Sequence, residues 1–397
     1  MQKNKINERY RWPISDAALE QRLRATQSYI KKENLDAVVI QTQNAIFDRG
    51  IRYYLDTQAH GYASALLIPA VGEMVYVSSG GENYDAPIPS SLKNVRKMIT
   101  LPYCPPFQFT DSMAGRTLAD EIRSAGYKRI GLYQKQSMSM AFGQTLESAL
   151  PDVVFTDASE GIYRLSAVKS DEEWELIRKC LRVHEQIIGA VPALLRPSKL
   201  ESTLQAELEW LALDMGCDTI GNLSVGSAPR GQNAVFIPRV CENRRIQEGD
   251  VVTVMVEVAG PGGVFCELAR SFCMGQPSDN LTELYAIARE AQRIVAGAAK
   301  PGVSGEALNR IYNEFIASYG LPANNRFVGH GQGYDMMESP AICPGETMTL
   351  ERDMFLAIHP ELVRNGEFAI CCDNFRVTDE GAIRETRTPQ EIICVEF

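Results

Sequence analysis

Two apolar runs joined by a glycine-rich turn constrain the fold of this chain more than any other segment. Residues 250–272 read DVVTVMVEVAGPGGVFCELARSF, which predicts a β-hairpin with Glu257 on one strand and Glu267 on the other. If residues 260–263 form a four-residue loop, the two glutamates face opposite sides of the sheet. A bulge or an odd loop places both on one face. The sequence leaves open whether they form an acid pair or one buried and one solvated glutamate.

Length and composition indicate a soluble globular protein of two domains. The chain has 397 residues, of which 45% are hydrophobic and 23% charged. A net charge of -10 argues against a nucleic-acid binder, and no apolar run is long enough to span a membrane. The polar start of the chain does not resemble a signal peptide, and the ten cysteines are scattered without a C-x-x-C motif. We therefore expect reduced thiols and a cytoplasmic location.

Helix and strand patterns alternate along residues 1–165, which predicts an α/β domain. The expected helices and strands comprise a helix at 21–35, a strand at 36–41, a hairpin at 63–79, a helix at 112–126 and a strand at 129–134. A second domain is expected to occupy residues 166–397.

The second domain is expected to begin with a capped helix. Ser170 with Glu173 three residues later has the pattern of a capping box. His184 lies on the apolar face of this helix, so we interpret it as a core histidine. A faint duplication follows, because Pro197 and Pro301 each precede a leucine-bearing helix, 104 residues apart. This pattern suggests two related α/β halves with a site between them.

Three polar residues in the second half are candidates for chemistry. His330 is flanked by glycines in VGHGQGYD, which leave room for a ligand to approach. His359 ends the apolar run MFLAI and precedes a proline, as expected for a polar residue that lines a cleft. Asp373 lies in a strand-like segment, where an aspartate needs a partner or a ligand.

The order of these motifs resembles the pita-bread superfamily, which includes creatinase, ectoine hydrolase, prolidase, aminopeptidase P and a dimethylsulfoniopropionate lyase. The similar segments are the hairpin, FVGHGQG, MFLAIHPEL and AICCDNFRVTDEG. The resemblance covers nearly the whole chain. It implies an N-terminal creatinase-like α/β domain (1–165) and a C-terminal pita-bread catalytic domain of duplicated α+β type (166–397).

The resemblance also implies that the site has been altered. Metallopeptidases of this fold carry Asp, Asp, His, Glu and Glu as ligands. The matching places here hold Met255 (or Glu257 after a one-residue shift), Glu267, His330, His359 and Asp373. Loss of the first carboxylate and replacement of the fourth by histidine should abolish ordinary two-metal peptidase chemistry.

Two interpretations follow from the resemblance. The favoured one is a metal-independent hydrolase, similar to creatinase and ectoine hydrolase, that cleaves an amide or amidine C–N bond of a small polar metabolite. His330 would act as general acid/base, assisted by His359 and by Glu257 or Glu267. Creatinase has a catalytic histidine in the segment matching 227–238, where this chain has Asn233, a candidate substrate contact.

The alternative is a single-metal site for Zn, Fe or Mn formed by Glu267, His330, His359 and Asp373. Such an enzyme would be a lyase or an Xaa-Pro dipeptidase. A non-catalytic binding module is a third possibility.

Similar proteins are homodimers in which the N-terminal domain of one subunit completes the site of the other. The resemblance therefore makes His60 and Tyr62 candidates for substrate contact in trans. Glu338 is a further candidate, either for a substrate nitrogen or for a salt bridge within its loop.

Overall fold

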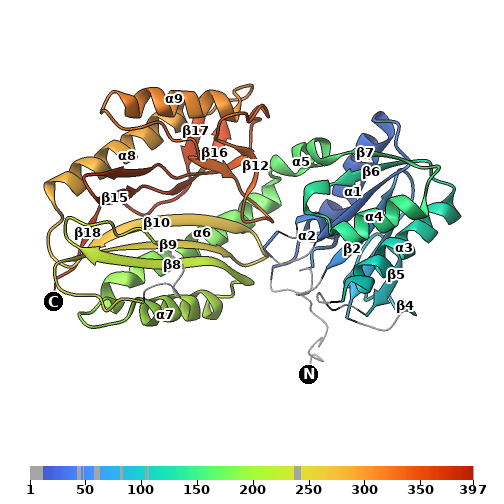
Figure 1. Cartoon of the computed structure of the whole chain (residues 1–397), viewed down its shortest axis with the longest axis horizontal. Helices are drawn as coiled ribbons and strands as arrows, with labels where there is room; N and C mark the ends of the chain where they lie inside the picture. Colours follow the sequence, from blue (N-terminus) through green and yellow to red (C-terminus); the bar gives the residue numbers. More distant parts are fainter. Residues whose placement is uncertain are drawn as a thin grey trace. The chain divides into compact units, whose positions relative to one another are not determined.

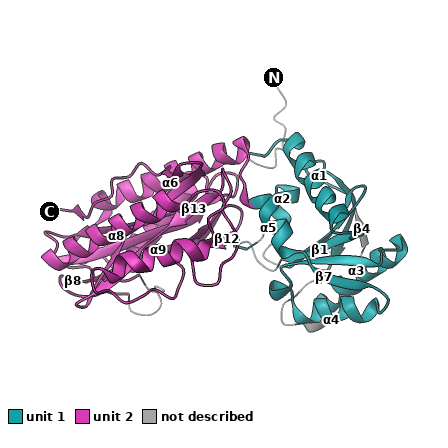
Figure 2. Ribbon diagram, turned by 90° about the horizontal axis from the view of Figure 1, so that it is seen from above, with its two compact units in different colours: residues 1–166 teal, residues 167–397 magenta. Residues whose placement is uncertain are grey.

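The computed structural model describes residues 12–42, 46–47, 49–57, 63–80, 84–102, 104, 107–236 and 243–396. The chain divides into two compact units, Met1–Ser166 and Ala167–Phe397, coloured separately in Figure 2. No helix among the described residues combines the length and the apolar character needed to cross a membrane.

Unit 1 is an α/β domain built on one mixed sheet, as predicted. The sheet has the strand order β4-β5-β3-β2-β1-β6-β7. Its elements are α1 (Asp16–Lys32), β1 (Ala37–Thr42), α2 (Arg49–Leu55), β2 (Ser64–Pro69), β3 (Met74–Ser79), β4 (Tyr84–Ala86), β5 (Val95–Leu101), α3 (Gln108–Ala125), β6 (Arg129–Tyr133), η1 (Lys135–Ser137), α4 (Met140–Ala149), β7 (Val154–Asp157) and α5 (Ser159–Ala167). Strands β2 and β3 form the antiparallel hairpin expected at residues 63–79.

Unit 2 contains two larger sheets, with the strand orders β18-β10-β9-β8 and β12-β11-β13-β16-β17, and the two-stranded sheet β14-β15. Its elements are α6 (Asp171–Leu194), α7 (Glu201–Asp214), β8 (Thr219–Pro229), β9 (Asp250–Ala259), β10 (Phe265–Cys273), α8 (Asp279–Ala298), α9 (Gly305–Ala317), β11 (Gly329–Gly331), β12 (Glu338–Ala341), β13 (Phe355–Ile358), β14 (Glu361–Arg364), β15 (Glu367–Ile370), β16 (Asp373–Thr378), β17 (Gly381–Arg384) and β18 (Ile393–Cys394).

Helices cover the outer faces of the sheets of unit 2 (Figure 1). One apolar core lies between α6, α7 and the β8–β10 sheet, and includes Leu204, Leu208 and Leu268. The other lies between α8, α9 and the second group of strands, and includes Leu308 and Leu356. The faces of the sheets that point away from the helices therefore line the interior of the domain, and polar side chains lie there.

Helix α6 starts as the sequence predicts. The Ser170 side chain accepts a hydrogen bond from the Glu173 N–H, and the Glu173 carboxylate accepts one from the Ser170 N–H. His184 is fully buried, and its Nδ1 donates to the Cys180 carbonyl oxygen at 2.9 Å. The prediction of a packed core histidine is therefore confirmed.

The hairpin of β9 and β10 has an odd loop, so Glu257 and Glu267 share a face. Ala259 pairs with Phe265, which leaves the five residues 260–264 in the turn and places Glu257 directly opposite Glu267. Gly262 and Gly263 adopt positive φ angles of 83° and 76°. The alternative with one buried and one solvated glutamate is wrong, since both side chains are buried.

Candidate functional site

The β-hairpin presents both glutamates on the inner face of its sheet. Along β9 the even-numbered residues Val254 and Val256 pack toward the helices. Met255 instead packs with residues of β10, β15 and the segment before β16, on the inner face. Glu257 has the same parity as Met255, so it extends into the interior as well. Met255 thus occupies part of this surface with an apolar side chain rather than with a carboxylate.

His330 and His359 reach Glu267 from the second sheet. His330 lies on β11, and His359 follows β13, the strand that pairs with β11. Their rings lie 5.2 Å apart, centroid to centroid, and Phe327 packs edge-on against both. The ligand atoms of Glu267, His330 and His359 all lie within 4.8 Å of one another. Three predicted site residues are therefore brought together.

The hydrogen bond of His330 fixes which ring nitrogen faces the cluster. Its Nδ1 lies 2.9 Å from the Gly331 carbonyl oxygen, which can only accept, so Nδ1 carries a proton. Nε2 then points a lone pair at Glu267 Oε2, 3.3 Å away. Two acceptors at this distance repel unless a cation, either a proton or a metal ion, lies between them.

Unsatisfied atoms in the cluster provide a test of whether a metal fits. Both ring nitrogens of His359 and Oε2 of Glu267 are buried and accept or donate no hydrogen bond within the described part of the chain. Buried polar atoms are rarely left in this state. Two imidazoles and one carboxylate are a donor set suited to Zn²⁺, Fe²⁺ or Mn²⁺. The residues present fit one divalent ion.

The charge states of Glu267 and His359 are compatible with the binding of a divalent ion. Burial alone would raise the pKa of Glu267, but His359, His330 and the Cys372 thiol lower it to about 2. Burial lowers the pKa of His359 to about 4, and His330 acts in the same direction against the opposing effect of Glu267. At neutral pH Glu267 is therefore ionised and His359 is neutral, the states in which both bind metal.

Glu257 differs from Glu267 although the two lie opposite each other. Burial, followed by the charge of Glu267, raises the pKa of Glu257 well above its ordinary value, against the hydrogen bonds from Asn222 and Gln332. Gln332 Nε2 donates to Glu257 Oε1 at 3.2 Å. A buried carboxyl group with a raised pKa thus lies opposite one with a lowered pKa, an arrangement typical of acid–base pairs.

Asp373 does not join the cluster, contrary to the set of four ligands expected from the sequence. Its Oδ1 accepts a hydrogen bond from the fully buried Arg270 at 2.7 Å. Its Oδ2 accepts from Gln390 Nε2 at 2.8 Å and from the Cys371 thiol. Both oxygens are thus engaged by partners outside the cluster, and Asp373 is not among the residues whose ligand atoms lie within 4.8 Å of one another.

The four predicted substrate contacts have different surroundings. Glu338, on β12, forms a buried ion pair of 2.7 Å with Lys169, which lies 169 residues away rather than in the same loop. Asn233 is exposed and accepts a local hydrogen bond from the Val235 N–H at 3.0 Å. His60 and Tyr62 lie outside the described residues.

Several residues around the cluster were not predicted from the sequence. Gln332 follows His330 by two positions, and its position between Gly331 and Gly333 was the one sequence feature that could have indicated its role. Asn374 accepts a hydrogen bond from the Glu267 N–H at 3.1 Å and so fixes the β10 backbone against β16. Glu361 lies 3.9 Å from His359 Nδ1. These contacts depend on pairings between distant segments.

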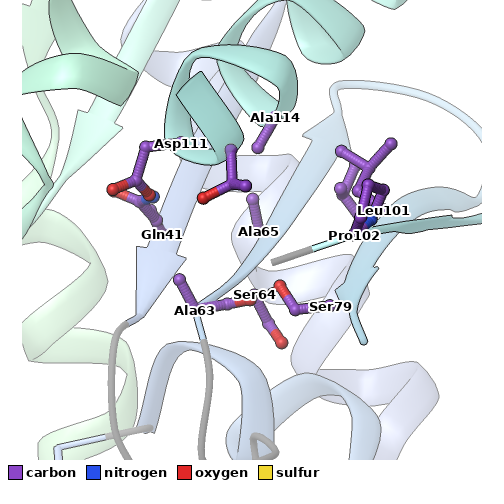
Figure 3. A pocket seen from close by; sticks show the side chains of 11 residues that line it. Gln41, Ala63, Ser64, Ala65, Ser79, Leu101, Pro102, Asp111 and Ala114 are labelled. Atoms are coloured by element: carbon purple, nitrogen blue, oxygen red, sulfur yellow. Dashed lines mark hydrogen bonds between the residues drawn. The ribbon is translucent and has the colours of Figure 1, made fainter. Parts of the chain in front are cut away.

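A small pocket in unit 1 is a poor competitor for the site. Gln41 and Asp111 lie together at one side of it (Figure 3), with Gln41 Nε2 donating to Asp111 Oδ1 at 3.3 Å. Its volume is about 10 Å³, which is roughly the space of one water molecule. This pocket is too small for a substrate, whereas the cluster in unit 2 has convergent polar groups.

Comparison with known families agrees with this geometry. Residues 175–385, more than half of the chain, match the model of metallopeptidase family M24, and residues 22–168 match the creatinase/prolidase N-terminal domain. The chain belongs to metallopeptidase family M24. The predicted pita-bread fold and its creatinase-like N-terminal domain are confirmed.

Relatives within the M24 family are named as peptidases. The uncharacterized peptidase YqhT of Bacillus subtilis is 26% identical over 286 residues, covering 70% of this chain and 79% of that protein. The probable dipeptidase PepE of Mycobacterium tuberculosis is 27% identical over 242 residues, covering 60% of this chain and 63% of that protein. The alignment thus spans less than two thirds of the mycobacterial protein.

Solved structures with the same fold cover nearly all of the chain. Dipeptidase PepE from Mycobacterium ulcerans has a TM-score of 0.77 at 22% identity, covering 97% of this chain and 100% of that one. The prolidase from Pyrococcus horikoshii OT3 has a TM-score of 0.76 at 20% identity, covering 94% and 100%. At these identities the likeness establishes the fold alone. Family membership supports the broad prediction of a hydrolase that acts on a C–N bond.

Proposed function

We propose that this M24 protein is a metal-dependent hydrolase that cleaves the amide C–N bond of a small peptide-like substrate, using one divalent ion held by Glu267, His330 and His359. The observation that carries the proposal is the buried set of unsatisfied donor atoms, which includes both ring nitrogens of His359. Relatives named dipeptidase and Xaa-Pro dipeptidase support a dipeptide as the substrate. They favour this alternative over the metal-independent, non-peptide reaction that the sequence suggested.

The residues around the cluster have separable roles in such a reaction. A divalent ion bound there would supply Lewis acidity that polarises a carbonyl group and lowers the pKa of water. Hydrogen bonds from His330 Nδ1 to Gly331 and from Asn374 to the Glu267 backbone hold two of the donors in orientation. Glu257, whose pKa burial raises, would serve as the acid that protonates the departing nitrogen, and Gln332 keeps its carboxyl group in place.

A decisive experiment measures metal content and hydrolysis on the same preparation. We expect about one equivalent of metal by mass spectrometry, hydrolysis of an Xaa-Pro dipeptide, loss of activity on chelation, and recovery when a divalent ion is returned. Glu257→Gln keeps the volume but removes the acidic proton, so turnover should fall by about 10²–10⁴-fold while metal content is unchanged. Dipeptide hydrolysis that is indifferent to chelation would refute the proposal.

The metal-independent interpretation retains one supporting observation. The cation required between His330 Nε2 and Glu267 Oε2, 3.3 Å apart, can be a proton, which makes His330 an imidazolium and a general acid. A metal-free preparation that cleaves an amidine or a guanidino compound such as creatine, but no dipeptide, would establish this second function. Elimination products would indicate a lyase, and a lack of turnover on either substrate class would favour a binding module.

The proposed enzyme acts as a homodimer in which the N-terminal domain of the partner subunit completes the site. This element of the proposal comes from the resemblance to dimeric relatives. Sedimentation of the full chain together with mixing of two inactive variants tests it. Recovery of activity from a His60→Ala chain mixed with a His330→Ala chain is the expected result.

A further inference from the structure

A pocket in unit 2 lies next to the cluster of Glu267, His330 and His359. It is bounded by the C-terminal half of α9, the segment that follows it and the start of β14, and its volume is about 370 Å³. Ligand pockets range from about 300 to 1,000 Å³, so this one suits a small molecule. Ile316, Leu321 and Leu362 supply an apolar wall. We call it the Arg326 pocket.

One layer of side chains separates the Arg326 pocket from the cluster. The Arg326 guanidinium lies over the ring of Phe327, 4.6 Å from its centroid. The same ring contacts His330 and His359, with centroids 5.7 Å away in each case. On the other side, Glu361 lines the pocket and lies 3.9 Å from His359 Nδ1. A ligand in this pocket therefore adjoins the reaction centre without occupying it.

The polar side chains that line the pocket comprise one cation, one anion, one hydroxyl and two amides, which belong to Arg326, Glu361, Tyr312, Asn324 and Asn325. Arg326 and Glu361 form an ion pair of 3.2 Å. The Arg326 side chain is 62% exposed, so water screens the pair and a ligand can replace it. The Tyr312 hydroxyl is buried beside Asn324 without a partner at hydrogen-bond geometry in the described residues. Tyr312 lies at the pocket wall.

These groups select among small ligands by charge. A simple anion is attracted by Arg326 but repelled by Glu361, and a simple cation has the reverse problem. A molecule whose ammonium and carboxylate lie on one carbon satisfies both groups at once, since the two groups are themselves only 3.2 Å apart. The apolar wall complements an aliphatic substituent.

We propose that the Arg326 pocket binds an aliphatic α-amino acid as its zwitterion, with Arg326 on the carboxylate and Glu361 on the ammonium. This site goes beyond the proposed hydrolysis, because a free amino acid contains no bond for the cluster to cleave. In a dipeptide hydrolase the pocket would hold a released product, and that reading rests on the proposed function. The binding itself does not.

Calorimetry with L-leucine tests the proposal on the full chain. Two probes serve as matched controls: isocaproate, which lacks the ammonium group, and isopentylamine, which lacks the carboxylate. We expect leucine to bind at least tenfold more tightly than either. Equal binding of isocaproate or isopentylamine, or no binding of leucine to the folded chain, would overturn the zwitterion assignment.

Variants locate the binding site. Arg326→Gln and Glu361→Gln should each weaken leucine binding at least tenfold, whereas Arg310→Gln, an exposed arginine on α9 outside the pocket, should leave it unchanged. Circular dichroism of each variant checks the fold. Unchanged affinity in both pocket variants would place leucine elsewhere and refute the inference.

A His330→Ala chain separates this inference from the proposed function. Leucine binding should persist there although metal is lost, since His330 does not line the pocket. Loss of leucine binding together with metal would mean that the amino acid binds at the cluster, which contradicts a separate pocket. Retained leucine binding in a chain that never binds metal would reject the proposed function and keep the inference.

Discussion

Two buried polar clusters of unit 2 lie close together along β10 but differ in how their atoms are satisfied. Glu267 belongs to the cluster with His330 and His359, in which several atoms have no hydrogen bond. Arg270, three positions later, pairs with Asp373, both of whose oxygens are engaged. Burial is nearly complete for both clusters. What separates a candidate site from a structural ion pair is therefore unused bonding capacity, rather than charge or burial.

The largest expected effect comes from removing a donor of the unsatisfied cluster. His330→Ala should lower turnover by at least about 100-fold and abolish stoichiometric metal binding. The stability of the metal-free chain should change less than in the Arg270→Met variant, because within the described part of the chain the ring donates one hydrogen bond, to the neighbouring Gly331 carbonyl. Steady-state kinetics, metal analysis and urea unfolding measure the three quantities. A large loss of stability without loss of metal would make this cluster resemble the Arg270 cluster and break the comparison.

For the ion pair of Arg270 and Asp373, we expect a large effect on stability rather than on metal binding. Arg270→Met leaves the buried Asp373 carboxylate with Arg384, at 3.8 Å, as its remaining cation among the described residues, so the free energy of unfolding should fall by about 3–5 kcal/mol. The double variant Arg270→Met with Asp373→Leu removes both charges and should recover much of this loss. Urea denaturation of the three chains tests the expectation. If the single variant were as stable as the parent chain, the pair would have no structural role.

A smaller loss of stability is expected when the buried ion pair of Lys169 and Glu338 is altered. Glu338→Gln leaves Lys169 facing an amide, and we expect a loss of about 1–3 kcal/mol because one buried charge is no longer balanced. KM should not change if Glu338 serves the fold alone. A rise in KM with unchanged stability would instead restore Glu338 to the role of a substrate contact.

The smallest effect is expected at Asn233, which is exposed and bonds only within its own turn among the described contacts. Asn233→Ala should change stability by no more than about 0.5 kcal/mol and leave KM unaltered. It also serves as a control for His330→Ala. A marked change in KM would show that this residue reaches the substrate.

Local chemistry explains which features the sequence could predict. The capping box of Ser170 and Glu173 spans four residues, and the periodic apolar pattern around His184 lies within one helix. Such features depend on neighbours along the chain, so the sequence contains all the information that is needed. The segments that carry Glu267, His330 and His359 were identified in the same way, through glycines and apolar runs adjoining each of them.

Long-range pairing explains what the sequence could not predict. Asp373 resembles a metal ligand until Arg270, 103 residues away, is found to engage its carboxylate. The roles of Glu361 and Gln332 likewise arise only when β11, β13 and β14 come together around His359 and Glu257. No periodic pattern records such contacts, because each partner is determined by tertiary packing.

The five-residue turn between β9 and β10 has a consequence for sequence comparison and for engineering. Successive side chains along a strand point to opposite faces of the sheet. If one residue were inserted into or deleted from the turn while β9 stayed in place, the pairing of β10 would shift by one residue. Glu257 and Glu267 would then lie on opposite faces. A change of two residues would preserve their common face. Alignments of related hairpins should therefore place only gaps of an even number of residues in this turn. A turn grafted from another protein must contain an odd number of residues, and matching the glycines alone is not enough.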